Sequence, residues 1–294
     1  PLAAGTKQNY ETARRLHLPA SFEARQVATI TPPAIDALYR GLEPTVTAHA
    51  LDRLNALLSG AFRRAVRAGR IELNPCRDAL LPAPDEPDTR TPETDEARTL
   101  LDACDTISVS FGLYARVVAQ TGARPGEVVA LQRGDVVDDS VTIERAASRV
   151  KGAVIIGPTK TGKRGIRRLA IGPVLAKRIQ MHIDEQDAEL ARLGAAASSE
   201  LWLFTDDYRR PWYPSTPSRW WREARDAAGI TDIRLYDLRH YVATELFAGG
   251  FDDQTTMRRL GHTNPSMGSK RYATNRPARD RLAAEHLEAQ LEGE

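Results

Sequence analysis

Apolar residues recur at helical spacing along most of the chain, and the pattern is clearest over residues 45–69. There they return every three or four positions, while the opposite face becomes basic towards the end of the segment. These apolar positions are Ala50, Leu54, Leu57, Leu58, Ala61, Phe62 and Ala65. Residues 6–18 and 31–39 also have helical character. The pattern therefore predicts a small helical bundle of about eighty residues, a usual size for a domain.

A proline-rich stretch follows this bundle. Residues 81–92 contain four prolines and almost no apolar side chain that a core could bury, a composition typical of a semi-extended linker. We therefore assign residues 1–81 to a helical first domain, residues 82–91 to a linker and residues 92–294 to a second domain.

The second domain combines helical segments with short β-branched runs. The runs 140–145, 153–157 and 165–171 are separated by turns rich in Lys and Gly, and they predict a small three-stranded antiparallel sheet. Helical spacing recurs over 94–101, where Thr94 is a candidate cap, and over 111–120, 173–193, 216–228, 237–248, 252–260 and 277–291. The predicted fold class is therefore mainly α (α+β), with a C-terminal tail helix from residue 277.

Composition narrows the class of protein. Apolar residues make up 41% and charged residues 27% of the chain, which is typical of a folded globular protein. No segment approaches the ~18 consecutive apolar residues of a membrane span, and the N-terminal residues lack the basic-then-apolar pattern of a signal peptide. We expect a protein of the bacterial cytoplasm or nucleoid that does not bind membranes. Cys76 and Cys104 lie outside any metal-binding or redox motif, so we predict buried free thiols and no metal.

The net charge of +2 conceals separated basic blocks. Residues 1–80 hold eleven Lys/Arg against seven Asp/Glu, and residues 145–178 hold ten Lys/Arg and no acid. Such blocks suit a polyanion such as DNA, although ordinary solvated helix faces would also produce them. The candidate DNA-contacting residues are Arg63, Arg64, Arg67, Lys163 and Arg164.

Two segments carry basic residues that could act on a phosphate. Arg124 opens a predicted helix, where its guanidinium and the free N–H groups of the helix end could bind a phosphate, and Glu127 one turn later could hold that guanidinium; an exposed ion pair is the alternative. Lys160 lies near Gly162 in the turn between the last two predicted strands, which glycine would allow to form a tight hairpin. Simple DNA contact or solvent exposure is the alternative for Lys160.

Two further segments carry titratable groups that could take part in chemistry. Tyr236, Arg239 and His240 lie three to four residues apart at a helix start and can share one face, although His240 could equally be a core histidine. Further on, His262 follows a predicted helix that stops at Gly261, and a turn at Pro265 could bring Tyr272 back over the same site. Half-buried packing is the alternative for Tyr272.

The order of these elements resembles the tyrosine recombinase family, which includes the phage integrases. The matching elements are Arg124 with Glu127, Lys160, the segment around Arg239, Leu-Gly-His262 and Tyr272. The resemblance spans residues 92–280, and residues 6–76 resemble the family's helical core-binding domain. It implies a site-specific DNA recombinase that cleaves and religates DNA without metal or nucleotide.

The resemblance also implies a role for each residue. Tyr272 would be the nucleophile that forms a 3′-phosphotyrosine, and Arg124 and Arg239 would neutralise the phosphate. Lys160 would protonate the leaving 5′-oxygen, His262 would donate to a phosphate oxygen, and Glu127 and His240 would support the site. The family usually has His where this chain has Tyr236, and a phenol with a reference pKa near ~10 is a poor base, so Tyr236 would serve mainly as a phosphate contact.

The expected partners also follow from the resemblance. They are double-stranded DNA at attachment (core) sites, further copies of the chain in a tetramer on two duplexes with the C-terminal helix docked in trans, and a host DNA-bending protein. Because the chain begins at Pro1, we expect that it is a fragment, and many phage integrases carry an arm-site-binding domain ahead of this point. A type IB topoisomerase-like strand transferase and a catalytically impaired DNA-binding relative are the alternative functions.

Overall fold

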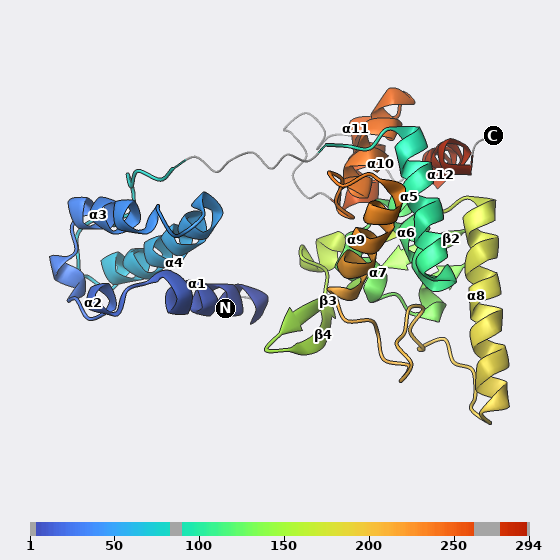
Figure 1. Cartoon of the computed structure of the whole chain (residues 1–294), viewed down its shortest axis with the longest axis horizontal. Coiled ribbons are helices and arrows are strands. Elements are labelled where there is room, and N and C mark those ends of the chain that lie inside the picture. The colour runs from blue at the N-terminus through green and yellow to red at the C-terminus, as the bar shows by residue number, and fades with distance from the viewer. Residues whose placement is uncertain (1–3, 83–89, 262–276, 293–294) are drawn as a thin grey trace. The chain divides into compact units, whose positions relative to one another are not determined.

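The computed structural model describes residues 4–82, 90–261 and 277–292. The chain forms two compact units, Pro1–Pro87 and Asp88–Glu294 (Figure 1). The boundary between the units falls inside the proline-rich stretch 81–92. None of the described helices is both long and apolar enough to cross a membrane.

The first unit is a helical bundle, and its helices over 6–18, 31–39 and 45–69 were predicted to within three residues at each end. Its elements are α1 (Ala4–His17), α2 (Ala20–Glu23), the 3-10 turn η1 (Val27–Thr29), α3 (Pro32–Leu42) and α4 (Ala48–Arg67). Thr47 caps α4, because its hydroxyl accepts a hydrogen bond from the backbone N–H of Ala50 at 3.4 Å. One face of α4 buries Leu54 and Phe62 against Ile35 and Tyr39 of α3, which closes the core of this unit.

The second unit is built around one fully surrounded helix. Its helices are α5 (Thr94–Ile107), α6 (Val109–Thr121), α7 (Pro125–Val129), α8 (Pro173–Arg192), α9 (Thr216–Ala228), α10 (Asp237–Ala248), α11 (Asp253–Leu260) and α12 (Pro277–Glu292). Helix α6 is buried from Phe111 to Thr121 because α5, α8, α10 and α12 all pack against it (Figure 1). Thr94 is the first residue of α5 rather than its cap; Glu93 takes that position and exchanges hydrogen bonds with Glu96.

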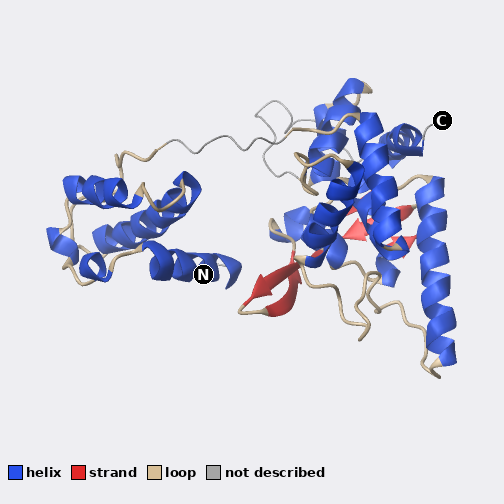
Figure 2. Cartoon of the chain, viewed as in Figure 1, coloured by secondary structure: helices blue, strands red, loops and turns tan. Residues whose placement is uncertain are grey.

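The strands form two small sheets instead of the single predicted one (Figure 2). Strands β1 (Val136–Val137), β2 (Ser140–Ile143) and β5 (Arg167–Ala170) make a three-stranded antiparallel sheet, and β3 (Arg145–Val150) pairs only with β4 (Ala153–Pro158). The predicted mainly helical fold with a small antiparallel sheet is confirmed, but the prediction that run 153–157 belongs to that sheet is wrong. The chain turns back at Lys151-Gly152, so β4 pairs with the residues directly before it.

Helix α12 packs within its own unit. Its apolar stripe is buried: Ala283 and Leu287 lie against Val242, Leu246 and Leu260 of α10 and α11. In the single chain, α10 and α11 thus supply the apolar partners that an amphipathic helix needs, and docking of α12 in trans on another copy stays a prediction.

Both cysteines are buried free thiols, as predicted. Cys76 belongs to the core of the first unit, and burial raises its pKa to about 11. Cys104 lies on α5 in the core of the second unit, where burial raises the pKa of the thiol well above its ordinary value. Each unit thus encloses one thiol that stays protonated near neutral pH.

Candidate active site

The carboxylate of Glu127 fixes the guanidinium of Arg124. Arg124 precedes Pro125, whose constrained backbone suits the first turn of α7. Glu127 Oε2 accepts a hydrogen bond from the Arg124 backbone N–H at 3.0 Å, and Oε1 accepts one from Arg124 Nη1 at 2.9 Å. The Arg124 side chain is 21% exposed, whereas the Glu127 side chain is completely buried. Glu127 therefore holds Arg124 in place from its buried side and leaves part of the guanidinium open to a ligand.

A second arginine, which sequence reasoning missed, also binds Glu127. Arg167 on β5 donates from Nη2 to Glu127 Oε2 at 2.7 Å, and its side chain is only 4% exposed. Burial acts to raise the pKa of Glu127, but the charge of Arg167 and the hydrogen bonds from Arg167 and Arg124 together hold that pKa below its ordinary value. Glu127 is consequently a permanent anion at neutral pH.

Arg239 enters the site from the first turn of α10. It is buried, and its Nη1 and Nη2 atoms donate to the backbone carbonyls of Gly122 and Leu260 respectively. Burial and then the positive charge of nearby Arg124 together lower the pKa of Arg239 to about 10. Arg239 therefore remains protonated at neutral pH, and Arg124 is one of the charged groups around it.

Two glycines allow the backbone to approach these arginines. Gly122 ends α6 with φ +64°, and a Cβ there would lie 2.8 Å from Leu260 Cδ2. Gly261 ends α11 with φ +63°, and a Cβ there would lie 2.8 Å from Arg167 Nη1. A side chain at either position would be strained and would push the neighbouring groups apart. The glycine of the Leu-Gly-His262 motif is thus required by the packing of Arg167.

Tyr236 and His240 form an exposed pair beside the arginines. Their rings meet edge to face with centroids 5.6 Å apart, as expected for residues one helical turn apart. Tyr236 is 40% exposed and His240 is also exposed. The alternative that His240 is a core histidine is wrong, because Leu238 and Val242 fill the buried face of α10 instead.

Lys160 lies in an exposed turn whose shape differs from the prediction. It does not lie in a β-hairpin, because β4 and β5 belong to different sheets. The connection instead contains the 3-10 turn η3 (Gly162–Gly165), and Thr159 Oγ1 donates to the Gly162 carbonyl at 2.8 Å. The backbone carbonyl of Gly165 accepts a hydrogen bond from Arg167 Nη1 at 3.1 Å. The segment that carries Lys160 is thereby tied to the arginine that also holds Glu127.

The remaining predicted site residues divide into exposed ones and undescribed ones. The side chains predicted to contact DNA are all exposed: Arg63, Arg64 and Arg67 on α4, and Lys163 and Arg164 in η3. His262 and Tyr272 lie outside the described residues. The structure thus brings together Arg124, Glu127 and Arg239, adds Arg167, and places Tyr236 beside them.

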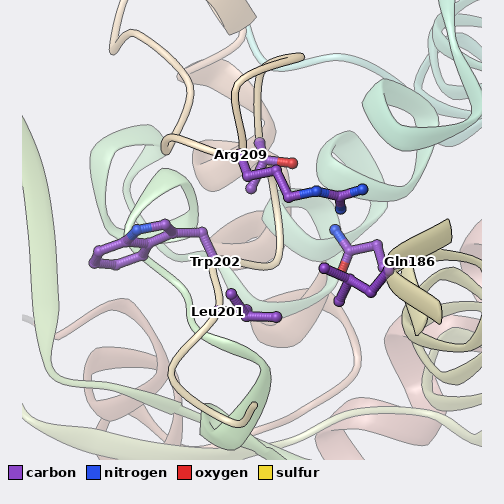
Figure 3. Close-up of a pocket in the computed structure, with 6 residues that line it drawn as sticks. Gln186, Leu201, Trp202 and Arg209 are labelled. Carbon is purple, nitrogen blue, oxygen red and sulfur yellow. The ribbon is translucent and has the colours of Figure 1, made fainter. Parts of the chain in front are cut away.

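A small pocket in the second unit lies apart from these residues. It is lined by α8 and by the loop after residue 200 (Figure 3). Its lining residues are Gln186, Leu190, Leu201, Trp202, Thr205 and Arg209. None of the predicted site residues contributes to it, and the guanidinium of Arg209 extends over Gln186.

Comparison with known proteins agrees with this geometry. Residues 91–279 match the Phage integrase family. The integrase of Mycobacterium phage L5 is 30% identical over 294 residues, which cover 97% of this chain and 75% of that protein. The structure of the Tn1549 transposon integrase with a circular intermediate DNA superposes with a TM-score of 0.76 at 16% identity, covering 97% of this chain and 94% of that one. A lambda integrase tetramer bound to a Holliday junction gives a TM-score of 0.64 at 22% identity, covering 91% of this chain and 74% of that one.

Proposed function

Because the chain belongs to the phage integrase family of site-specific tyrosine recombinases, we propose that it cleaves and rejoins DNA through a 3′-phosphotyrosine at Tyr272. The observation that carries this assignment of residues is the cluster around Glu127. There Arg124 and Arg167 bind a single carboxylate, and Arg239 adds a third guanidinium near enough for its charge to interact with theirs. The excess of positive charge suits a phosphate that gains negative charge as its transition state forms.

The cleavage step follows from the chemistry of the named groups. The phenol oxygen of Tyr272 forms a bond to phosphorus and gives its proton to water, while the bond from phosphorus to the 5′-oxygen breaks. Lys160 donates a proton to that 5′-oxygen, which leaves as a hydroxyl. Religation is the reverse attack of a 5′-hydroxyl on the phosphotyrosine. The energy of the phosphodiester is retained in the protein–DNA ester, so the step needs no nucleotide.

Arg239 and Arg124 are held in different ways, and we assign each a different contact to the phosphate. Arg239 is buried and oriented by two backbone carbonyls, so its remaining N–H groups have a fixed direction. Arg124 is partly exposed and held by Glu127. A planar guanidinium can donate two parallel hydrogen bonds to one phosphate, and we assign one nonbridging oxygen to each arginine. His262 and Tyr236 are assigned further hydrogen bonds to the same phosphate.

The first unit supplies the proposed core-site contacts. Arg63, Arg64 and Arg67 are exposed towards the end of α4, opposite the buried face of that helix. Together with Lys163 and Arg164 they would contact backbone phosphates of a duplex attachment site, which fixes register without reading sequence. Residues 1–81 are thus assigned to core-site binding and residues 92–294 to catalysis.

Two DNA duplexes and four copies of the chain complete the proposal. The lambda integrase structure that resembles this chain is a tetramer bound to a Holliday junction. Helix α12 packs in cis in the single chain, and we propose that in the tetramer it docks in trans on the next copy. A host DNA-bending protein is proposed as an accessory factor, and strand exchange by the purified chain should increase when host extract is added.

Covalent trapping tests the proposal. DNA protected by the protein in footprinting is made into a nicked duplex from which the cleaved fragment diffuses away, so that the phosphotyrosine adduct accumulates. The wild-type chain should form this adduct without added metal, and Tyr272→Phe should form none while binding the duplex with nearly the same affinity. An adduct in the Tyr272→Phe variant would overturn the assignment of the nucleophile. Exchange of strands between two duplexes distinguishes a recombinase from a topoisomerase.

A further inference from the structure

We propose that Arg167 is a positioning residue for strand cleavage, because it fixes three parts of the site relative to one another. These parts are the Arg124–Glu127 pair, the segment 159–166 that carries Lys160, and the end of α11. The inference rests on the function proposed above and adds to it a residue that does not touch the DNA.

The hydrogen bonds of Arg167 carry this inference. Each of its three guanidinium nitrogens serves a different acceptor: Nη2 donates to Glu127 Oε2 at 2.7 Å, Nε donates to the Arg259 carbonyl at 2.8 Å, and Nη1 donates to the Gly165 carbonyl at 3.1 Å. The acceptors are 40, 92 and 2 residues away in sequence. Only a planar group with several donors can hold three such acceptors at once.

The surroundings of Arg167 leave it little room to move. Its side chain is 4% exposed. The α-carbon of Gly261 lies so close to the guanidinium that an added Cβ would be 2.8 Å from Nη1 and 3.0 Å from Cζ. Arg167 is therefore confined between Gly261 and Glu127, and a shift of its guanidinium would also move the Glu127 carboxylate.

Loss of Arg167 would act on the reaction through Glu127. The two carboxylate oxygens have different donors: Oε1 accepts from Arg124 Nη1, and Oε2 accepts from both Arg167 and the Arg124 backbone N–H. Without Arg167, the buried carboxylate loses its second cation and its pKa rises towards the ordinary value. Arg124 then loses the rigid support that directs it to the phosphate, and a misplacement of about 1 Å can cost roughly 10²-fold in rate.

Single-turnover cleavage of the nicked duplex tests the inference, with Arg167→Gln and Arg167→Lys as variants. Arg167→Gln should cleave roughly 10²-fold more slowly than wild type while its dissociation constant for the duplex changes by no more than about threefold. Arg167→Lys keeps the charge but can serve fewer acceptors, so it should recover only part of the rate. Arg133→Gln is the matched control, because Arg133 is a buried arginine of the same unit that pairs with Asp187 and contacts none of the site residues that the structure describes.

A double-mutant cycle separates positioning from general destabilisation. If Arg167 acts through Glu127, then Arg167→Gln should cost much less in a Glu127→Gln background than in wild type. The Arg167→Gln rate should also fall with acidification at a higher pH than the wild-type rate, because Glu127 is easier to protonate. Each cleavage rate is divided by the fraction of protein that binds DNA. If Arg167→Gln fails to fold, the test uses Arg167→Lys, which retains the ion pair with Glu127.

The possible failures can be told apart. If wild type forms an adduct and both Arg167 variants cleave at the wild-type rate, the positioning role is overturned and the proposed function stands. Equal losses from Arg167→Gln in the two backgrounds would also overturn a role through Glu127. If wild type forms no adduct on the footprinted duplex, the proposed function itself fails.

Discussion

The charged side chains of the site are held by partners within the protein. Arg239 donates to two backbone carbonyls, and Glu127 binds two arginines. A group held in this way does not need to reorganise when a phosphate binds, which is the condition under which hydrogen-bond donors stabilise a transition state most. Because Arg239 is buried and Arg124 is partly exposed, we expect their removal to have different effects on the melting temperature.

Arg124→Ala and Arg239→Ala should both slow cleavage by roughly 10²–10³-fold, since each removes a donor to the developing charge. Only Arg239→Ala should also lower the melting temperature clearly, because it leaves a buried space and two carbonyls without their donor. Arg124 is partly exposed, so its removal should change the melting temperature little. Thermal unfolding and single-turnover cleavage of the same samples provide the check, and equal destabilisation by the two variants would contradict this account.

Tyr236 takes the place where the family usually has a histidine, and its exposure limits what it can do. Tyr236→Phe should cost less than tenfold in cleavage rate, because the hydroxyl can contribute one hydrogen bond worth about 1 kcal/mol. His240→Ala removes the ring that packs against Tyr236 and is the comparison variant. A loss as deep as that of Tyr272→Phe in either case would show that this exposed pair takes part in proton transfer.

The sequence indicated some of these residues and concealed others for physical reasons. Arg124 and Glu127 are three residues apart at a helix start, so their contact is local and could be predicted. Arg167 lies within a stretch of basic residues that all look alike in sequence, and its partners are brought to it only by the fold. The same holds for Asp280, which contacts Arg259 across 21 residues that include the undescribed segment.

At the scale of elements, helices were easier to predict than strand pairing. The helices from α8 to α12 lie within two residues of their predicted ends, because a helix satisfies its own hydrogen bonds and its apolar face has a clear period. Strand β3 has the sequence Arg-Ala-Ala-Ser-Arg-Val, which lacks the alternation of a half-buried strand. Its pairing with β4 depends on the turn at 151–152, so the composition of the strands alone could not assign the sheets.

Helix α12 is anchored by two buried acids as well as by its apolar stripe. Asp280 Oδ1 accepts from Arg259 Nη1 at 2.8 Å, and Oδ2 accepts from the Ala170 N–H at 2.6 Å. Glu288 Oε1 accepts from the Leu175 N–H at 3.1 Å. Both acids lie in the interior of the second unit. The helix is therefore held in the second unit by polar as well as apolar contacts.

Removal of the Asp280 carboxylate should destabilise the second unit strongly. Arg259 is completely buried, so Asp280→Ala leaves a buried cation without its partner and should cost about 3–5 kcal/mol in the free energy of unfolding. Arg281→Ala is the control, because the neighbouring Arg281–Asp139 pair is exposed and should contribute less than about 1 kcal/mol. Denaturant unfolding measures both. Equal midpoints for the two variants would show that α12 is not anchored through Asp280.

At the scale of the whole molecule, the chain consists of two units with separate cores. The core of the first unit is drawn from α2, α3, α4 and the segment around Cys76, and the main core of the second is drawn from residues 97–291. Because the two cores have no residue in common, we expect each unit to unfold separately from the other. The cluster of Arg124, Glu127, Arg167 and Arg239 lies wholly in the second unit, while Arg63, Arg64 and Arg67 belong to the first.

The two buried thiols allow the opening rate of each unit to be measured separately. The thiolate is the form of cysteine that attacks alkylating reagents, and burial keeps both Cys76 and Cys104 protonated and shielded. Alkylation of each cysteine should therefore proceed only as fast as its own unit opens. Peptide mapping at graded urea concentrations should yield two different opening free energies, and Asp280→Ala should accelerate labelling of Cys104 but not of Cys76. Identical acceleration at both cysteines would mean that the chain opens as one cooperative body. The native sequence, with one thiol in each unit, therefore needs no added label to report the opening rate of each unit.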